Sequence, residues 1–122
     1  MNSVIDYMAC GQRSWGRIDC VHRAVEVFYH HTGLDLKPFV PRYGTRKEAI
    51  EASRAGGGLR AIAQRIAADV GLRKGLNEQG DIGVVATRWG DSLAINIGHG
   101  NWCAATPEGV VITYDFLDCW RL

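Results

Sequence analysis

Apolar residues in the first half of the chain recur at the three- and four-residue spacing of a helix that is buried along one side. This spacing predicts a helix from Asp19 to Thr32, with Asp19 as its N-cap and Gly33 just beyond its C-terminal end. The predicted buried stripe consists of Val21, Ala24, Val25, Phe28 and His31. We therefore expect this helix to pack against a second layer of the fold.

Two further helices are predicted between residues 45 and 71. The sequence from Thr45 to Glu48 has the form of a capping box, which opens a helix that ends near Ala55. Three glycines at 56–58 separate it from a third helical segment, which Gly71 closes. Two prolines in the stretch 34–43 predict an extended connection between the first helix and the second.

The spacing changes in the second half of the chain to short runs of β-branched or apolar residues. These runs are Ile82 to Thr87, Leu93 to Ile97, Trp102 to Ala105 and Val110 to Thr113. Turns that contain Gly, Asp or Pro separate them, which predicts an antiparallel meander. The last eight residues predict a helical turn followed by an edge segment that carries Trp120. Helices followed by strands indicate an α+β domain with the helices on one face of the sheet.

Length and composition fit a single compact domain spanning residues 1–122. The chain has 14 lysine and arginine residues and 13 aspartate and glutamate residues. Its charge is therefore balanced and does not indicate a nucleic-acid partner. No apolar run approaches the roughly 20 residues of a membrane helix, and residues 1–6 lack the order of a secretion signal. We therefore expect no membrane insertion, synthesis in a cytoplasm, and free thiols at Cys10, Cys20, Cys103 and Cys119.

Cys20 is the first candidate for chemistry, because the run from Trp15 to Cys20 leads straight into the first predicted helix. At a helix N-terminus, unpaired backbone N–H groups and the helix dipole favour a thiolate over a thiol. A cysteine in this position is a candidate nucleophile. A small buried apolar residue is the equally weighted alternative, since that is the role of most free cysteines.

A nucleophilic thiol needs a base within hydrogen-bond reach, and the chain has four histidines. His22 is two positions along the same helix and points about 200° away from Cys20. His30 and His31 are roughly 15 Å further down the helix axis. His99 lies in a glycine-flanked turn between two predicted strands, where it is a weak candidate base, and a polar turn residue is the alternative.

Neither a metal ion nor a cofactor is predicted. The chain has no C-x-x-C or H-x₃-H pattern, and Cys20 with His22 does not have a usual zinc spacing. The glycines at 56–58 precede a helix but lack the Lys-Ser/Thr pair of a P-loop. Asp19 is explained as an N-cap, and no pair of carboxylates has a spacing that indicates glycosidase chemistry.

Several segments together are similar to a known pattern. Trp15-Gly16 with Asp19-Cys20 before a helix resembles the active-site helix of NlpC-type cell-wall cysteine peptidases, which have a compact papain-like fold. The whole chain more closely resembles a small domain family of unknown function found in phages and prophages and related to those peptidases. The further matching segments are Thr32 to Asp35, Tyr43-Gly44, Gly56 to Leu59, Gly80-Asp81, Gly109-Val110 and Trp120-Arg121.

The resemblance implies an NlpC-related α+β fold in which the helical half carries Cys20 and docks on the sheet. It also implies a catalytic histidine at the start of the second strand, a position that Ser92 occupies here. The orienting polar residue of the next strand has no good counterpart between Cys103 and Ala105. His99 lies seven residues beyond Ser92, which is roughly 23 Å along an extended strand.

Two functions are consistent with these residues. The first is a degenerate, non-catalytic domain that works as a structural or assembly component of phage or prophage tails and binds other phage proteins. Its groove residues would be Asp19 with Trp15, Trp89 and Trp102, although core packing explains each tryptophan equally well. The second is an active cysteine peptidase or amidase that cleaves peptidoglycan peptides with Cys20 as nucleophile. In the first case we expect the protein in the host cytoplasm when made and then in the virion tail.

Overall fold

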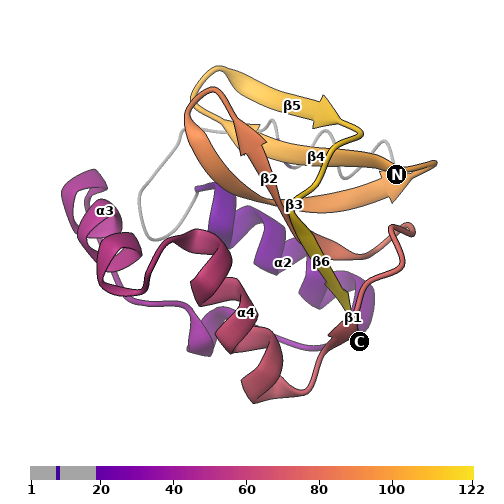
Figure 1. The fold of residues 1–122 in the computed structure, drawn as a ribbon, viewed down its shortest axis with the longest axis horizontal. Helices are drawn as coiled ribbons and strands as arrows, with labels where there is room; N and C mark the ends of the chain where they lie inside the picture. The colour runs from indigo at the N-terminus through magenta and orange to yellow at the C-terminus, as the bar shows by residue number, and fades with distance from the viewer. Residues whose placement is uncertain (1–7, 9–18) are drawn as a thin grey trace.

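A computed structural model describes Met8 and residues 19–122. In this part of the chain the helices come first, as Figure 1 shows, and are α2 (Cys20–Thr32), the short 3₁₀ helix η1 (Lys37–Phe39), α3 (Arg46–Ala55) and α4 (Leu59–Val70). The strands that follow are β1 (Arg73–Lys74), β2 (Ile82–Thr87), β3 (Gly90–Gly98), β4 (Asn101–Thr106), β5 (Gly109–Thr113) and β6 (Asp118–Arg121). The predicted α+β class is thus confirmed, and none of the helices described is long and apolar enough to cross a membrane.

The predicted helix ends are those of the structure. The Asp19 carboxylate accepts a hydrogen bond from the backbone N–H of His22 at 2.9 Å, and Gly33 follows α2 in the left-handed conformation with φ of 80°. The Thr45 hydroxyl oxygen accepts from the backbone N–H of Glu48 at 3.1 Å. These caps satisfy backbone donors that a helix N-terminus otherwise leaves unpaired.

The strands form one antiparallel sheet with the order β1-β6-β2-β3-β4-β5. The predicted meander is confirmed as β2 to β5, which are neighbours in sequence and in the sheet. The predicted edge segment at the C-terminus is wrong, because β6 lies between β1 and β2. The helical turn expected before it is also absent, since residues 114–117 form bends and extended backbone. The two-residue strand β1 covers the outer edge of β6, and so short a strand leaves no periodic signal.

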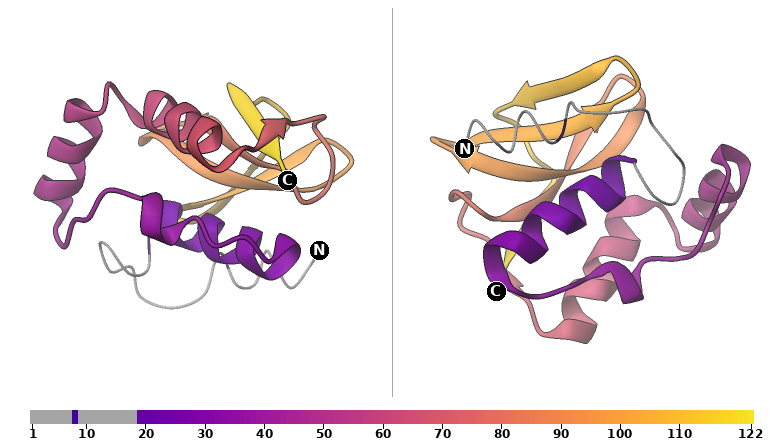
Figure 2. Two further views of the ribbon diagram at one scale, coloured as in Figure 1. Left: turned by 90° about the horizontal axis from the view of Figure 1, so that it is seen from below. Right: turned by 180° about the vertical axis from the view of Figure 1, so that it is seen from behind.

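Helices α2 and α4 both pack against the core on one face of this sheet. Figure 2 shows the two helices beside the sheet from two further directions. The core between the layers includes Val25 and Phe28 of α2, Ala67 of α4, and Leu93 and Ile95 of β3. The buried stripe predicted for α2 ends at Phe28, because His31 is exposed in the last helical turn rather than buried. Helix α3 stands apart from the sheet and buries no residue.

The opposite face of the sheet carries a second, smaller core. It consists of Val85, Ala94, Trp102, Ala104 and Cys119. The ring of Trp102 lies 5.3 Å from that of Phe116, centroid to centroid, and packs over Gly83. A Cβ at Gly83 would stand 2.8 Å from a ring carbon of Trp102, so only glycine lets the indole lie this close to the strand. The two cores therefore mark the two faces of the central strands.

Candidate functional site

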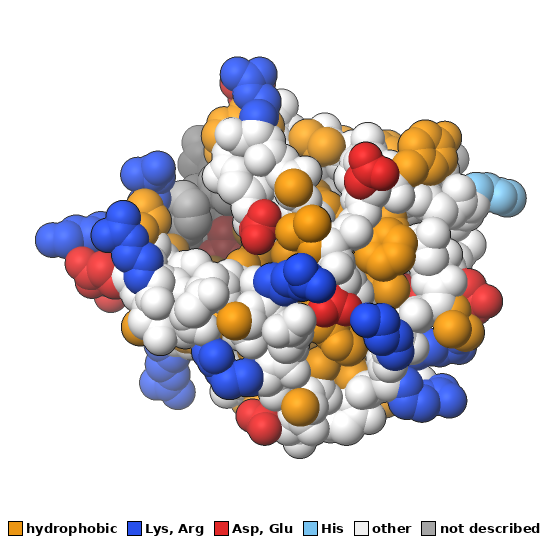
Figure 3. All heavy atoms as spheres, in the orientation of Figure 1, with side chains coloured by type: hydrophobic (Ala, Val, Ile, Leu, Met, Phe, Trp, Pro, Cys, Tyr) orange, Lys and Arg blue, Asp and Glu red, His pale blue; other side chains and the backbone are white. Residues whose placement is uncertain are grey.

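A cavity of about 430 Å³ opens between the start of α2, helices α3 and α4, and the β2–β3 hairpin. In Figure 3 the surface is hollowed on this side, between α3 and the tip of the hairpin. Aliphatic side chains from α2, from the segment that follows it, from α4 and from the sheet line most of the cavity. They include Val25, Leu36, Ile62, Ile66 and Leu93. Its size and apolar lining are those of a small binding site.

Cys20 borders this cavity as the first residue of α2 and is partly buried against the helix-side core. The residue before it, Asp19, is buried, and its carboxylate accepts hydrogen bonds from both the backbone N–H and the ring Nδ1 of His22, each at 2.9 Å. Asp19 therefore uses a first-turn donor that would otherwise stabilise a thiolate. Its own negative charge also opposes a second anion on the neighbouring residue.

None of the four histidines of the chain lines this cavity. The ring of His22 is held by Asp19 and lies edge-on to Tyr43, with 5.6 Å between centroids. His30 is exposed and pairs with Glu26 at 3.0 Å. His99 is exposed at the far end of β3, where its φ of 55° suits the tight turn into β4. The structure thus does not bring the candidate base His99 to Cys20, and it favours the turn role.

Ser92 also borders the cavity, but its side chain belongs to the other face of the sheet. It pairs in register with Val85, a member of the small core that lies away from the helices. Its hydroxyl donates to the carbonyl oxygen of Leu93 at 3.3 Å. Because side chains alternate along a strand, the helix-side positions here are Asp91 and Leu93. The position expected for a catalytic histidine therefore carries neither an imidazole nor a side chain that faces Cys20.

Asp91 is the residue that sequence reasoning missed. It is exposed at the mouth of the cavity, on the helix side of β3, and its carboxylate makes no hydrogen bond or ion pair with any residue that the structure describes. A shift of one residue along a strand exchanges the two faces, so register decides whether Ser92 or Asp91 faces Cys20. The structure decides this because Leu93, two residues further along β3, packs against the helices, and the sequence alone gives no signal for that choice of face.

The tryptophans divide between cavity and core. Trp89, at the hairpin tip, borders the cavity and is 41% exposed, with the Arg88 guanidinium 5.0 Å from its ring centroid. Trp102 is fully buried in the small core and donates from Nε1 to Asn77 Oδ1 at 2.9 Å, so core packing and not groove lining explains it. Trp120 lines the cavity without having been a candidate. Trp15 lies outside the described residues.

Cys20, Cys103 and Cys119 are free thiols, as predicted. Burial raises the pKa of Cys103 to about 11, and burial is also the main cause that raises the pKa of Cys119. Two of these three thiols are therefore core residues. Within the described ranges, no group of three or more His, Cys, Asp or Glu side chains is placed to hold a metal ion.

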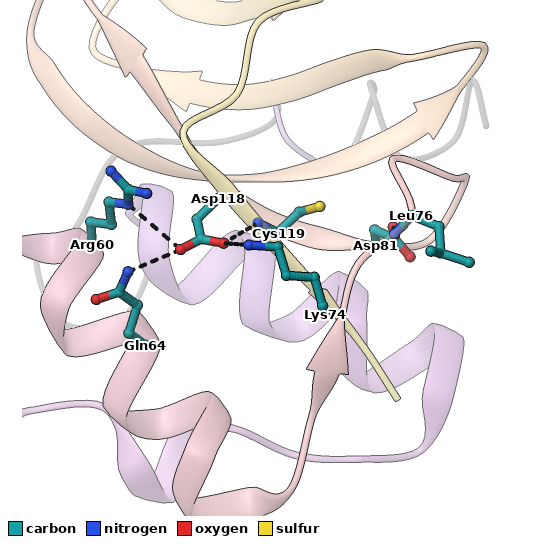
Figure 4. Close-up of polar contacts among 7 residues, drawn as sticks. All are labelled: Arg60, Gln64, Lys74, Leu76, Asp81, Asp118 and Cys119. Atoms are coloured by element: carbon teal, nitrogen blue, oxygen red, sulfur yellow. Dashed lines mark hydrogen bonds and ion pairs between the residues drawn. The ribbon is translucent and has the colours of Figure 1, made fainter.

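A second polar cluster lies away from the cavity, around Asp118 of β6 (Figure 4). Its carboxylate accepts hydrogen bonds from Gln64 Nε2 at 3.0 Å and from the backbone N–H of Cys119 at 3.0 Å. It also pairs with Lys74 at 3.4 Å and Arg60 at 3.6 Å. Burial raises the pKa of Asp118, but the hydrogen bond from Gln64 and the charge of Lys74 outweigh it, so the pKa is lowered overall. The cluster joins α4, β1 and β6 and is structural.

Asp81 fixes the loop before β2 in a similar way. It is buried, and one of its carboxylate oxygens accepts from the backbone N–H groups of Leu76 at 2.9 Å and Glu78 at 3.1 Å. These two hydrogen bonds order the turn that leads into β2.

Fold and site together define a small α+β domain with a cysteine at a helix N-terminus beside an apolar cavity. The chain belongs to the family described as Domain of unknown function (DUF6950), which covers residues 1–122. Comparison with curated proteins and with solved structures gives no match.

Proposed function

We propose that this domain is an assembly component of phage or prophage tails, built on a degenerate NlpC-like, papain-like fold that does not catalyse hydrolysis. The observation that carries the proposal is the cavity beside Cys20, whose lining includes none of the histidines of the chain. The protein is made in the host cytoplasm and taken into the tail by binding other phage proteins. The phage context rests on the resemblance of the sequence alone.

The chemistry of the cavity supports binding over catalysis. A positioned base contributes about 10²–10⁴ to the rate of a proton-transfer step, and the histidine position of the related peptidases holds Ser92, whose side chain faces away. The buried carboxylate of Asp19 adds a negative charge next to the thiol. What remains is an apolar pocket with few polar groups, which suits recognition of an apolar segment.

A cysteine peptidase or amidase that acts on peptidoglycan peptides is the second candidate. It is favoured by the position of Cys20 at the first residue of α2 and at the edge of the cavity. Asp91 is the carboxylate available there to take the thiol proton, since it shares the helix-side face of β3 with Leu93. A carboxylate is a poorer match than imidazole for this transfer at neutral pH.

The two candidates separate in one assay with matched variants. The native protein and Cys20→Ala are incubated with purified muropeptides, and the products are separated by mass. We expect that neither protein cleaves the muropeptides, so that the two product profiles are identical. In parallel, Cys20→Ala leaves the yield of assembled particles unchanged, whereas Trp89→Ala at the cavity mouth lowers it. Cleavage that disappears in Cys20→Ala would overturn the assembly proposal in favour of the hydrolase.

A further inference from the structure

The cavity beside Cys20 combines an aliphatic interior with a carboxylate, that of Asp91, at its mouth. Its described lining contains two charged residues, Asp19 and Asp91, and no lysine or arginine. The carboxylate of Asp19 is engaged by His22. The carboxylate of Asp91, in contrast, has no hydrogen bond or ion pair with any described residue. Among the residues that the structure describes, a ligand that enters this cavity therefore meets apolar surface inside and the Asp91 carboxylate at the entrance.

The apolar interior and the carboxylate at the mouth both favour binding of a ligand in this cavity. An open cavity lined by aliphatic side chains exposes apolar area to water, and a ligand that covers this area gains the free energy of its burial. A volume of about 430 Å³ exceeds that of a packing defect and falls within the range of binding pockets. The Asp91 carboxylate is exposed at this entrance, so a cationic group that arrives from solvent can reach it.

Trp89 adds a third recognition element at the same mouth. Its indole is 41% exposed at the hairpin tip, and Arg88 stacks over it at 5.0 Å from the ring centroid. Partly exposed tryptophans supply large rigid contact areas in protein interfaces. Trp89 is in the turn that precedes Asp91, so the aromatic surface and the carboxylate flank one entrance.

We propose that the cavity docks an apolar and basic peptide segment of the assembly partner. One aliphatic side chain of that segment enters the cavity, and a lysine or arginine one or two residues away pairs with Asp91. The segment lies against Trp89 while it is bound. This inference rests on the proposed assembly function and names the chemistry of the partner.

The test selects a displayed random heptapeptide library on the full-length native protein and then titrates the selected peptides by calorimetry. Each peptide is made in two forms, with its basic residue and with glutamate in that place. We expect the selected sequences to share an aliphatic residue next to Lys or Arg, and the glutamate forms to bind about tenfold more weakly. Asp91→Lys reverses this order. Asp69→Asn, an exposed carboxylate of α4 outside the cavity, behaves as the native protein does.

Three results would overturn the inference. Selection could yield no shared sequence, or the selected peptides could bind Asp91→Asn as tightly as the native protein. Decylammonium chloride, run as a competitor, could bind in an Asp91-dependent way while no peptide does, which would make the occupant a small cationic amphiphile. The inference is tested by peptide binding, whereas the assembly function is tested by particle yield and muropeptide cleavage, so failure of the inference is distinguishable from failure of the proposed function.

Discussion

Two carboxylates on the same sheet, those of Asp118 and Asp91, differ in their burial and in their hydrogen-bond partners. Asp118 is buried, and residues of α4 and β1 and the backbone of β6 all reach its oxygens. Asp91 stands at the mouth of an apolar cavity and has no partner among the described residues. The fold fully accounts for the first group but gives no structural role to the second. The difference is the reason why we propose a binding role for the cavity end of the molecule.

The largest expected change in stability comes from replacing two tryptophans, one in the small core and one at the cavity mouth. Trp102→Ala removes a fully buried indole and its hydrogen bond to Asn77, so we expect the free energy of unfolding to fall by about 3–5 kcal/mol. Trp89→Ala removes a side chain that is 41% exposed and is expected to cost less than about 1 kcal/mol. Urea denaturation followed by circular dichroism measures both. Equal losses of stability in the two variants would show that Trp89 is also a core residue. The distinction between the cavity mouth and the small core would then no longer hold.

A smaller effect is expected from adding volume on the two sides of the sheet. Ala104→Leu overfills the small core, where Ala104 is fully buried, and should cost about 1–3 kcal/mol. Ala63→Leu on α4 places the same added volume beside the cavity, so we expect no loss of stability or a small gain. Thermal unfolding of the two variants provides the comparison. A large loss in Ala63→Leu would mean that the cavity is not available space.

The smallest effect concerns the titration of Asp118. Its pKa in the folded protein lies below the ordinary value of 3.8, so the carboxylate contributes stability above that pH and loses it as the pH falls through the folded pKa. Asp118→Asn should cost about 1–2 kcal/mol at neutral pH. The difference from the native protein should shrink below pH 3.8. Denaturation curves at a series of pH values test this, and a difference that is independent of pH would contradict the assigned network.

Local patterns predicted much of the fold. Alternation and turn residues place β2 at Ile82–Thr87, the range found in the structure, and the caps at Asp19 and Thr45 follow from side-chain chemistry. The position of β6 could not be predicted in this way. It depends on pairing with β1, which has two residues and no apolar alternation, and with β2, which lies more than 30 residues earlier.

The candidate site was predictable as a region but not as a set of side chains. Cys20 at a helix start follows from the sequence, and the structure places it beside a cavity. The choice between Ser92 and Asp91 depends on which face of β3 meets α2, a property of tertiary packing. Trp89 and Trp102 were equivalent in the sequence, and burial alone separates them.

The most direct test of the central claim is the rate of alkylation of Cys20 as a function of pH, read by mass spectrometry of its peptide. Cys103 and Cys119 are matched internal controls, because both are buried and should react only after unfolding. The account predicts that Cys20 reacts with the pH dependence of an unactivated thiol. Fast reaction at acidic pH, with an apparent pKa well below the reference of about 8.5, would contradict it. That result would identify an activated nucleophile and favour the hydrolase.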